Sequence, residues 1–320
     1  MAVRYKNTSL KSTNVRIKFD FKALLSRLFF TAAWAISERL TKQIIKLLFF
    51  KPVSYPNSDA QEKILSRAQT FTFQSQGNTL AAYKWGEGPA VLFVHGWAGR
   101  GAQVCSYVPK LVSKGYSVLA FDHVAHGRSQ GSAANYFLFS NAVYDFLDQM
   151  ADTDVCAIVA HSLGASAAIN YLWRTKKKTV TIFMAPALYL IEMLDQTFDQ
   201  YGVPDYIFKI MLDEIGKQTG HSLALENPKD LLKFLSHEIM IVHDTGDKAV
   251  AYEDSWNAGI LHNNISLVPT KGLGHIRILE DEAIVDLVVN KIENSAPVAD
   301  DNASDYDDSG NDLPKVEALL

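Results

Sequence analysis

The chain has 320 residues, of which 48% are hydrophobic and 21% charged, a composition typical of a globular protein with one large or two modest domains. The net charge is −4, but residues 296–320 hold seven acids against Lys315, so the rest of the chain is near +2. A nearly neutral body offers no broad basic face, which argues against nucleic acid as a partner. Two cysteines, Cys105 and Cys156, are too few for a disulfide framework and favour a reducing, cytoplasmic location.

Residues 1–60 are predicted to form a basic, amphipathic helical segment. The apolar run over residues 23–36 is interrupted by Arg27 and is shorter than the roughly 20 residues that a membrane-spanning helix needs. No small-residue cleavage site followed by polar sequence indicates a signal peptide. Apolar and charged residues then alternate at helical spacing over residues 40–50. We expect these helices to pack on the body of the protein, with peripheral contact to a membrane surface as the alternative.

Residues 61–295 alternate between strand and helix patterns and predict one α/β domain. The turn residues Gly77 and Asn78 predict a hairpin between the first two strands, and the later alternation favours a parallel sheet with helices on both faces. The expected strands are 70–76, 79–85, 90–94, 117–122, 155–160, 179–184, 238–243 and 265–268, and the expected helices are 137–150, 163–174 and 280–292.

The strand pattern stops for about fifty residues after the sixth strand. Residues 186–237 are instead helical in pattern and rich in aromatic residues. An insertion between consecutive strands would lie over the carboxyl ends of the sheet, so we expect a small helical lid. Residues 296–320 are too polar to bury a core, and we expect an acidic disordered tail.

The central motif follows the strand at 155–160. This buried, β-branched run passes without loop residues into the small-residue start of a helix, which places Ser162 on a sharp turn. Such a turn projects the serine hydroxyl above the end of the sheet, and the amide of Leu163 faces the same space. Ala160 and Gly164 provide the small neighbours that the turn requires.

The segment Ala160-His161-Ser162-Leu163-Gly164 resembles the nucleophile elbow G-x-S-x-G of the α/β-hydrolase family, with alanine at the first glycine. Residues 122–129 resemble the family's D-x-x-G-x-G-x-S loop, with Ala125 at its first glycine, and we expect a structural role for them. The resemblance covers residues 65–292. It implies a mostly parallel, eight-stranded α/β-hydrolase sheet.

The family order is serine, then acid, then histidine, and candidates occur here in that order. The acid usually precedes two residues and a valine, which favours Asp247, with Val250 after it, over Asp244. Either carboxylate could reach an imidazole from this loop, and Asp244 could instead form a turn. His275 follows two glycines in Lys271-Gly272-Leu273-Gly274, after the last strand, and is the candidate base.

The resemblance also implies an oxyanion hole. The amide of Leu163 is one candidate donor, and in the segment His95-Gly96-Trp97 the amide of Trp97 is the second. We expect the Trp97 side chain to contact substrate. His161, beside the serine, is a further candidate for substrate contact, although a buried hydrogen-bonding role is the more ordinary interpretation. His123, His126 and His161 lack the HExxH pattern or carboxylates of a metal site, so no metal or cofactor is expected.

Taken together, these motifs imply a serine hydrolase that cleaves carboxylic esters or thioesters with an apolar acyl group. The alternatives are a membrane-associated acyltransferase, a lysophospholipase or monoacylglycerol lipase, and a non-catalytic ligand-binding protein. The expected partner is a small-molecule acyl ester. The sequence carries no signal for the oligomeric state.

Overall fold

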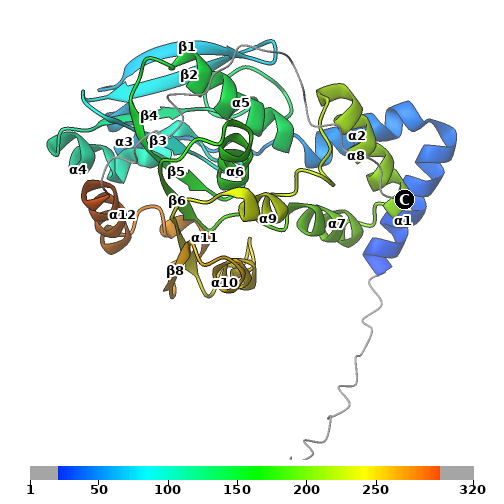
Figure 1. The fold of residues 1–320 in the computed structure, drawn as a ribbon. Coiled ribbons are helices and arrows are strands. Elements are labelled where there is room, and N and C mark those ends of the chain that lie inside the picture. Colours follow the sequence, from blue (N-terminus) through cyan, green and yellow to red (C-terminus); the bar gives the residue numbers. More distant parts are fainter. Residues whose placement is uncertain (1–20, 296–320) are drawn as a thin grey trace, which may run out of the picture.

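The computed structural model describes residues 21–295, and the structural statements that follow refer to these residues. Their strands form one eight-stranded sheet in the order β1-β2-β4-β3-β5-β6-β7-β8 (Figure 1). The strands are β1 (Gln69–Ser75), β2 (Asn78–Trp85), β3 (Ala90–Val94), β4 (Ser117–Phe121), β5 (Val155–His161), β6 (Val180–Met184), β7 (Ile239–Asp244) and β8 (Ile265–Thr270).

The sheet is mostly parallel, as expected. β1 and β2 form an antiparallel hairpin, and β2 also pairs antiparallel with β4. All pairings from β4 through β8 are parallel. Every residue of β3, β4, β6 and β7 is buried, which agrees with the unbroken apolar runs that predicted strands covered on both faces. The fold expected from the sequence is therefore confirmed.

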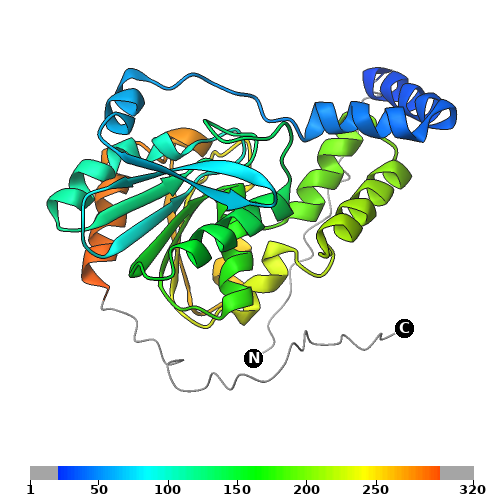
Figure 2. The ribbon, with the colours of Figure 1, turned by 90° about the horizontal axis from the view of Figure 1, so that it is seen from above.

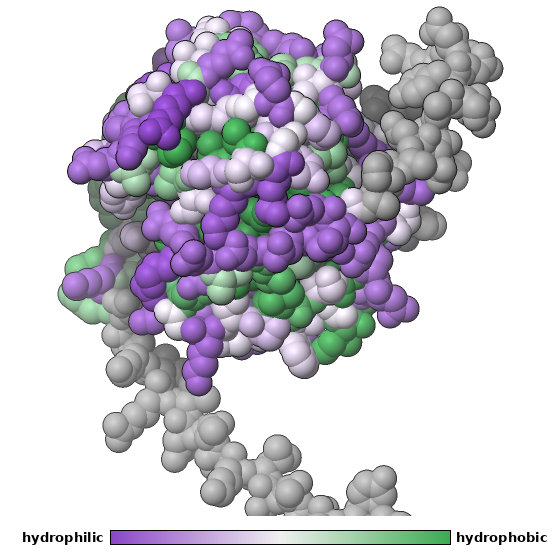
Figure 3. Space-filling view, turned by 90° about the vertical axis from the view of Figure 1, so that its left-hand side faces the viewer, coloured by the Kyte–Doolittle hydropathy of each residue, from purple (hydrophilic) through white to green (hydrophobic). Residues whose placement is uncertain are grey.

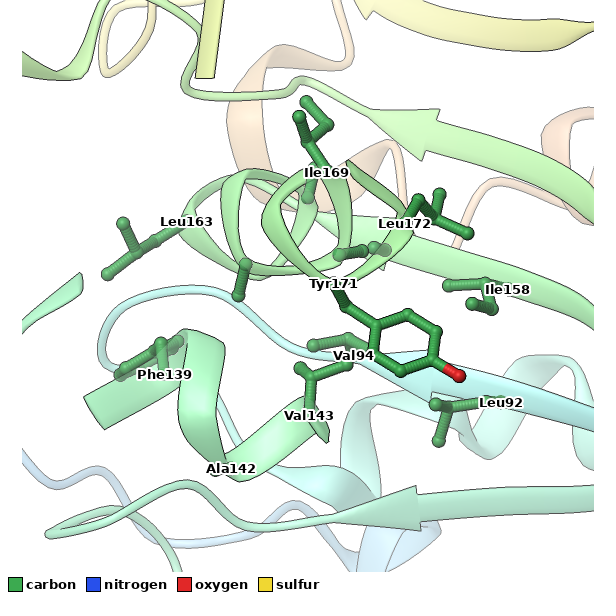
Figure 4. Packing of buried hydrophobic residues seen from close by; sticks show 14 of the residues in the cluster. Leu92, Val94, Phe139, Ala142, Val143, Ile158, Leu163, Ile169, Tyr171 and Leu172 are labelled. Atoms are coloured by element: carbon green, nitrogen blue, oxygen red, sulfur yellow. The ribbon is translucent and has the colours of Figure 1, made fainter. Parts of the chain in front are cut away.

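Helices cover both faces of the sheet. One face packs against α5 (Tyr136–Gln149), α6 (Leu163–Thr175) and α10 (Tyr252–Leu261), and the other against α4 (Val108–Ser113) and α12 (Glu282–Asn294). Figure 4 shows Tyr171 of α6 extending toward Val143 of α5 and Leu92 of β3, and Leu172 on the side of Ile158 of β5. This packing holds α6 on the sheet.

Several short elements have no counterpart in the sequence predictions. They are α3 (Asp59–Leu65), the 3₁₀ helix η1 (Gly101–Ser106), α4, α10 and α11 (Gly274–Arg277). Most of them span one to two turns, too few for an apolar periodicity to stand out. Ser58 and Gln61 do form a capping box at α3, a signal that was available in the sequence.

The segment between β6 and β7 is helical. It contains α7 (Leu190–Gln200), α8 (Asp205–Thr219), α9 (Pro228–Leu231) and the 3₁₀ helix η2 (Leu232–Phe234). Its position in the chain and its helical content agree with the lid expected at residues 186–237. We refer to α7 and α8 as the cap.

The amino-terminal helices are α1 (Phe21–Ile36) and α2 (Glu38–Phe49). Figures 1 and 2 both place them beside the cap, at the end of the molecule opposite α4 and α12. Phe30 and Ile45 are buried in a small core that they share with cap residues such as Phe198 and Phe208. Within residues 21–295, no helix combines the length and the apolar character needed to cross a bilayer. Residues 1–20 of the expected basic segment and the expected tail at 296–320 lie outside the described residues.

Candidate active site

Ser162 occupies a strained turn between β5 and α6. Its backbone has φ 53° and ψ −123°, a conformation that side-chain-bearing residues rarely adopt. Two glycines allow the chain to pack around it. A Cβ at Gly164 would lie 2.4 Å from the carbonyl oxygen of His95, and a Cβ at Gly96 would lie 2.7 Å from the Cβ of Ser162. Ala160, at the first glycine of the motif, fits with 1% of its surface exposed.

Three side chains from separate loops meet at this turn. The Nε2 atom of His275 lies 3.0 Å from the Oγ of Ser162, and its Nδ1 lies 2.7 Å from Oδ2 of Asp247. In the tautomer that satisfies both contacts, Nδ1–H donates to the carboxylate and Nε2 accepts from the serine hydroxyl. The structure thus brings together the predicted serine, acid and base with the geometry that nucleophile activation requires.

Asp247 is held as a carboxylate. Burial alone would raise its pKa, but the His243 imidazole close by and hydrogen bonds from His275 and from the amides of Val250 and Ala249 outweigh burial and lower the pKa well below its usual range. The group therefore stays ionised at neutral pH, and it can accept a hydrogen bond from Nδ1–H of His275.

Asp244, the alternative acid, makes different contacts. Its Oδ2 accepts from the amide of Leu273 at 2.8 Å and from Thr270 Oγ1 at 3.0 Å, while Oδ1 accepts from the amide of Gly246 at 2.9 Å. These hydrogen bonds tie the acid loop to the loop that carries His275. Asp244 thus connects the two loops and does not contact the imidazole, so the structure favours Asp247 as the acid.

Sequence reasoning missed His243. This residue is fully buried; its Nδ1 lies 2.7 Å from the hydroxyl of Ser255, and its Nε2 lies 3.3 Å from Oδ2 of Asp247. Asp247 is therefore flanked by two imidazoles, His243 and His275. A histidine at the end of the apolar run Ile239–Val242 was the available signal, because a polar side chain there must find a buried partner.

The two candidate oxyanion donors lie beside Ser162. Leu163 is the first residue of α6, so its amide has no intrahelical acceptor, and Trp97 follows Gly96, which packs directly on Ser162. Within residues 21–295, neither amide donates to a backbone carbonyl. The loop is fixed from the other side by His126, whose Nε2 accepts from the amide of Ala98 at 3.1 Å.

The predicted substrate contacts have different outcomes. Trp97 lines the cavity above Ser162, whereas His161 does not. The Nε2 atom of His161 lies 3.0 Å from the carbonyl oxygen of His275, and burial lowers the pKa of His161 to about 3. His161 is therefore a neutral residue that supports the loop carrying His275. The structure places its side chain outside the cavity, although we expected it to contact substrate.

A cavity of about 350 Å³ adjoins Ser162 and His275. Its walls come from the sheet domain, from the cap and from the carboxyl end of α2, and they are mostly apolar. The side chains from α2 and the cap are Phe49, Phe50, Leu190, Met193, Leu194, Thr197, Phe198, Leu212 and Ile215. The volume is at the lower end of the range for small-molecule sites, roughly 300–1,000 Å³. Of the residues between 21 and 295 that line it, none is an aspartate, glutamate, lysine or arginine.

The histidines considered for a metal site do not form one. Among residues 21–295 there is no group of three histidine, cysteine or acidic side chains placed to hold a metal ion. His123 is stacked on Phe139 with ring centroids 3.7 Å apart, and His126 supports the loop at Ala98. The Asp122 carboxylate accepts from the Tyr83 hydroxyl and the amides of Gly101 and Arg128, which agrees with a structural role for its loop.

The strand order, the serine elbow after β5 and the position of the helical insertion define an α/β-hydrolase. The sequence profile of the serine aminopeptidase S33 family matches residues 88–255, just over half of the chain, and the chain belongs to that family. The expected hydrolase class is thereby confirmed.

Individual relatives are more distant. A non-heme chloroperoxidase, CPO-A1 of Kitasatospora aureofaciens, is 30% identical over 128 residues, which is 39% of this chain and 46% of the relative. The chain thus spans about half the length of that curated relative.

Solved structures share the fold at low identity. Est1E from Butyrivibrio proteoclasticus, bound to ferulic acid, superposes with a TM-score of 0.54 at 19% identity over 70% of this chain and 99% of that one. The Pyrococcus furiosus esterase Pf2001 gives a TM-score of 0.54 at 17% identity over 76% and 97%. A thioesterase domain from the curacin biosynthetic pathway gives 0.51 at 16% identity, over 70% and 99%.

Proposed function

We propose that this protein is a serine hydrolase that cleaves carboxylic ester or thioester bonds of small molecules with an apolar acyl group. The observation that carries the proposal is the contact of His275 with both Ser162 Oγ, at 3.0 Å, and Asp247 Oδ2, at 2.7 Å. A serine hydroxyl is a weak nucleophile at neutral pH and needs such a base, held by a third group.

The reaction has two halves. The Oγ of Ser162 attacks the carbonyl carbon while Nε2 of His275 takes the hydroxyl proton, and the amides of Trp97 and Leu163 stabilise the oxyanion. Collapse of the tetrahedral intermediate breaks the bond to the alcohol or thiol, which leaves with the proton from His275. Water, activated by His275, then attacks the acyl-enzyme, and the carboxylic acid is released.

The walls of the cavity support the choice of substrate. An alkyl or aryl acyl group would contact the apolar residues of the cap, while Asn135, Tyr136 and Thr197 add polar groups to those of Ser162 and His275. An aminopeptidase would have to hold the substrate's ammonium group. The cavity-lining residues within 21–295 include no carboxylate, and a buried cation needs an anionic partner, so these walls suit an ester better than an aminopeptidase substrate.

Two related activities use the same residues. An acyltransferase would pass the acyl group to an acceptor other than water, and a lysophospholipase or monoacylglycerol lipase would take its ester from a membrane. The exposed apolar side chains of α1 and α2 favour the second of these. A non-catalytic binding protein of the same fold would have no need for a serine, histidine and aspartate in mutual contact.

Covalent labelling tests the proposal. A fluorophosphonate should label the full chain at Ser162, and Ser162→Ala should abolish labelling. The kcat/KM for p-nitrophenyl esters of increasing acyl chain length should then show which apolar acyl group is preferred. Each of these values should exceed the kcat/KM for leucine p-nitroanilide, an aminopeptidase substrate. A folded protein that is not labelled, or labelling that survives Ser162→Ala, would identify a binding protein instead.

A further inference from the structure

We propose that the outer surface of α1 and α2 is a docking surface for an anionic lipid bilayer. Eight large apolar side chains on these helices each expose half or more of their surface, namely Phe21, Leu25, Leu28, Phe29, Ile36, Leu40, Leu47 and Leu48. We call this set the α1–α2 apolar face. Single exposed apolar side chains are common on proteins, but a cluster of this kind marks an interaction surface.

The arrangement of side chains around each helix shows that the face points away from the protein. On α1, the buried Phe30 contacts the cap core, and Leu28 lies about 160° around the helix from it. On α2, Ile45 is buried in the same core, and Leu47 is likewise about 160° away. Because both inner sides are turned toward the cap, both outer sides are turned toward solvent.

Charge identifies the occupant. Residues 21–51 contain six basic residues against one acid, Glu38. Arg39 and Lys46 are exposed and each directly precedes a leucine of the face, so they border its apolar stripe. Basic residues that border an apolar helix face are the pattern of helices that bind anionic membrane surfaces.

A second copy of the chain fits this surface less well. A symmetric dimer would place the same net positive helices against each other, and like charges would then oppose association. Acidic residues of the neighbouring cap do not reverse the local charge. Five of the six acids of α7 and α8 are paired with a lysine or arginine: Asp199 with Arg27, Glu214 with Lys42, Asp205 with Lys209, Asp213 with Lys217 and Glu192 with Lys229. The sixth is Asp195.

The surface is also linked to the cavity. Phe49 and Phe50, at the carboxyl end of α2, line the cavity together with residues of α7 and α8. Docking through α1 and α2 would therefore bring the apolar walls of the cavity close to the lipids of the bilayer. The opposite end of the molecule differs, because hydrophilic side chains predominate on the face shown in Figure 3. The delivery of lipid esters to Ser162 rests on the proposed function, whereas docking itself does not.

Vesicle co-sedimentation tests docking separately from catalysis. The full chain carrying Ser162→Ala should bind phosphatidylcholine vesicles with about 30% phosphatidylserine at least tenfold more tightly than neutral vesicles. Each of Arg39→Gln and Lys46→Gln should weaken binding about fivefold, the equivalent of ~1 kcal/mol per charge near an anionic surface. High salt should reduce binding in the same way.

Substitutions in the face supply the decisive comparison. Leu28→Gln, Leu40→Gln and Leu47→Gln combined should reduce binding at least tenfold with an unchanged melting temperature, because these side chains are exposed. A matched control replaces three exposed apolar residues elsewhere, with Leu225→Gln, Ile260→Gln and Leu261→Gln, and should bind like the parent protein.

Three results would overturn the proposal. They are the absence of binding to anionic vesicles, equal binding to neutral and anionic vesicles, and unchanged binding by the triple variant of the face. Sedimentation velocity tests whether a second copy of the chain binds this face instead. If the parent protein is a dimer and the triple variant is a monomer, the face is a dimer interface. If docking holds but fluorophosphonate labelling fails, only the proposed function falls.

Discussion

Asp244, the last residue of β7, and Asp247, in the loop that follows, make a sharp test, because they are three residues apart and have different contacts. Asp247→Asn keeps the shape of the side chain but can present its NH₂ group to Nδ1 of His275. The imidazole would then carry its proton on Nε2, facing Ser162 Oγ, where it cannot accept the serine proton. We expect kcat for an ester to fall by about 10⁴, the size of effect seen when a triad acid becomes an amide.

Asp244→Asn should behave in the opposite way. The amide presents one oxygen and one NH₂ group where the carboxylate presented two acceptors to Gly246 and Leu273, which leaves one partly buried N–H unpaired at a cost of about 1 kcal/mol. The free energy of unfolding should fall by that amount, while kcat stays within about tenfold of the parent value because His275 keeps its acceptor. The measurements are urea denaturation and ester hydrolysis on both variants. A larger loss of kcat in Asp244→Asn than in Asp247→Asn would refute the assignment of the acid.

Three further predictions concern the pair Ser162 and His275, the buried His123, and Ala125. Ser162→Ala and His275→Ala should each lower kcat by about 10⁴ to 10⁶, and the double variant should be little worse; near-additive losses in single-turnover assays would contradict their acting as one unit. His123 is buried with neither ring nitrogen hydrogen-bonded within the described chain, and burial, with smaller effects of its histidine neighbours, lowers its pKa well below the usual value. Below pH ~6.5 the unfolded chain therefore binds a proton at His123 that the folded chain does not, so the free energy of unfolding falls on acidification. His123→Leu should remove this loss. The substitution should therefore stabilise the protein by about 2 kcal/mol more at pH 5 than at pH 7. An equal effect at both pH values in chemical denaturation would rule this out. Ala125 has φ 63°, so Ala125→Gly should leave the melting temperature unchanged or raise it, because relief of strain offsets the added freedom of the unfolded chain; a clear drop would show that its methyl group matters more than the strain.

Most of the fold could be predicted from the sequence, because strands buried on both faces are unbroken apolar runs. β3, from Ala90 to Val94, has the predicted ends, and the elbow follows β5 as expected. The short helices α4 and α11 were missed because one or two turns show no clear periodicity. The order of motifs also led to Ser162, Asp247 and His275, which the structure brings into contact.

Contacts between distant loops could not be predicted in the same way. Whether Asp244 or Asp247 reached the imidazole depended on how two loops pack, and the hydrogen bond from Leu273 to Asp244 decides it. The position of His161 under the histidine loop, instead of in the cavity, depends on the same packing. The role of His243 was hidden because its partner, Ser255, comes from the following helix.

The contribution of Phe49 and Phe50 to the cavity has a consequence for inference by homology. The family profile matches residues 88–255, a region that includes Ser162 but neither these two aromatic residues nor His275. Two members could therefore share the whole matched region and still accept acyl groups of different length, because one wall of the binding space is supplied by an appendage before it. Substrate assignments should therefore be transferred only between proteins that also share Phe49 and Phe50 at the carboxyl end of α2.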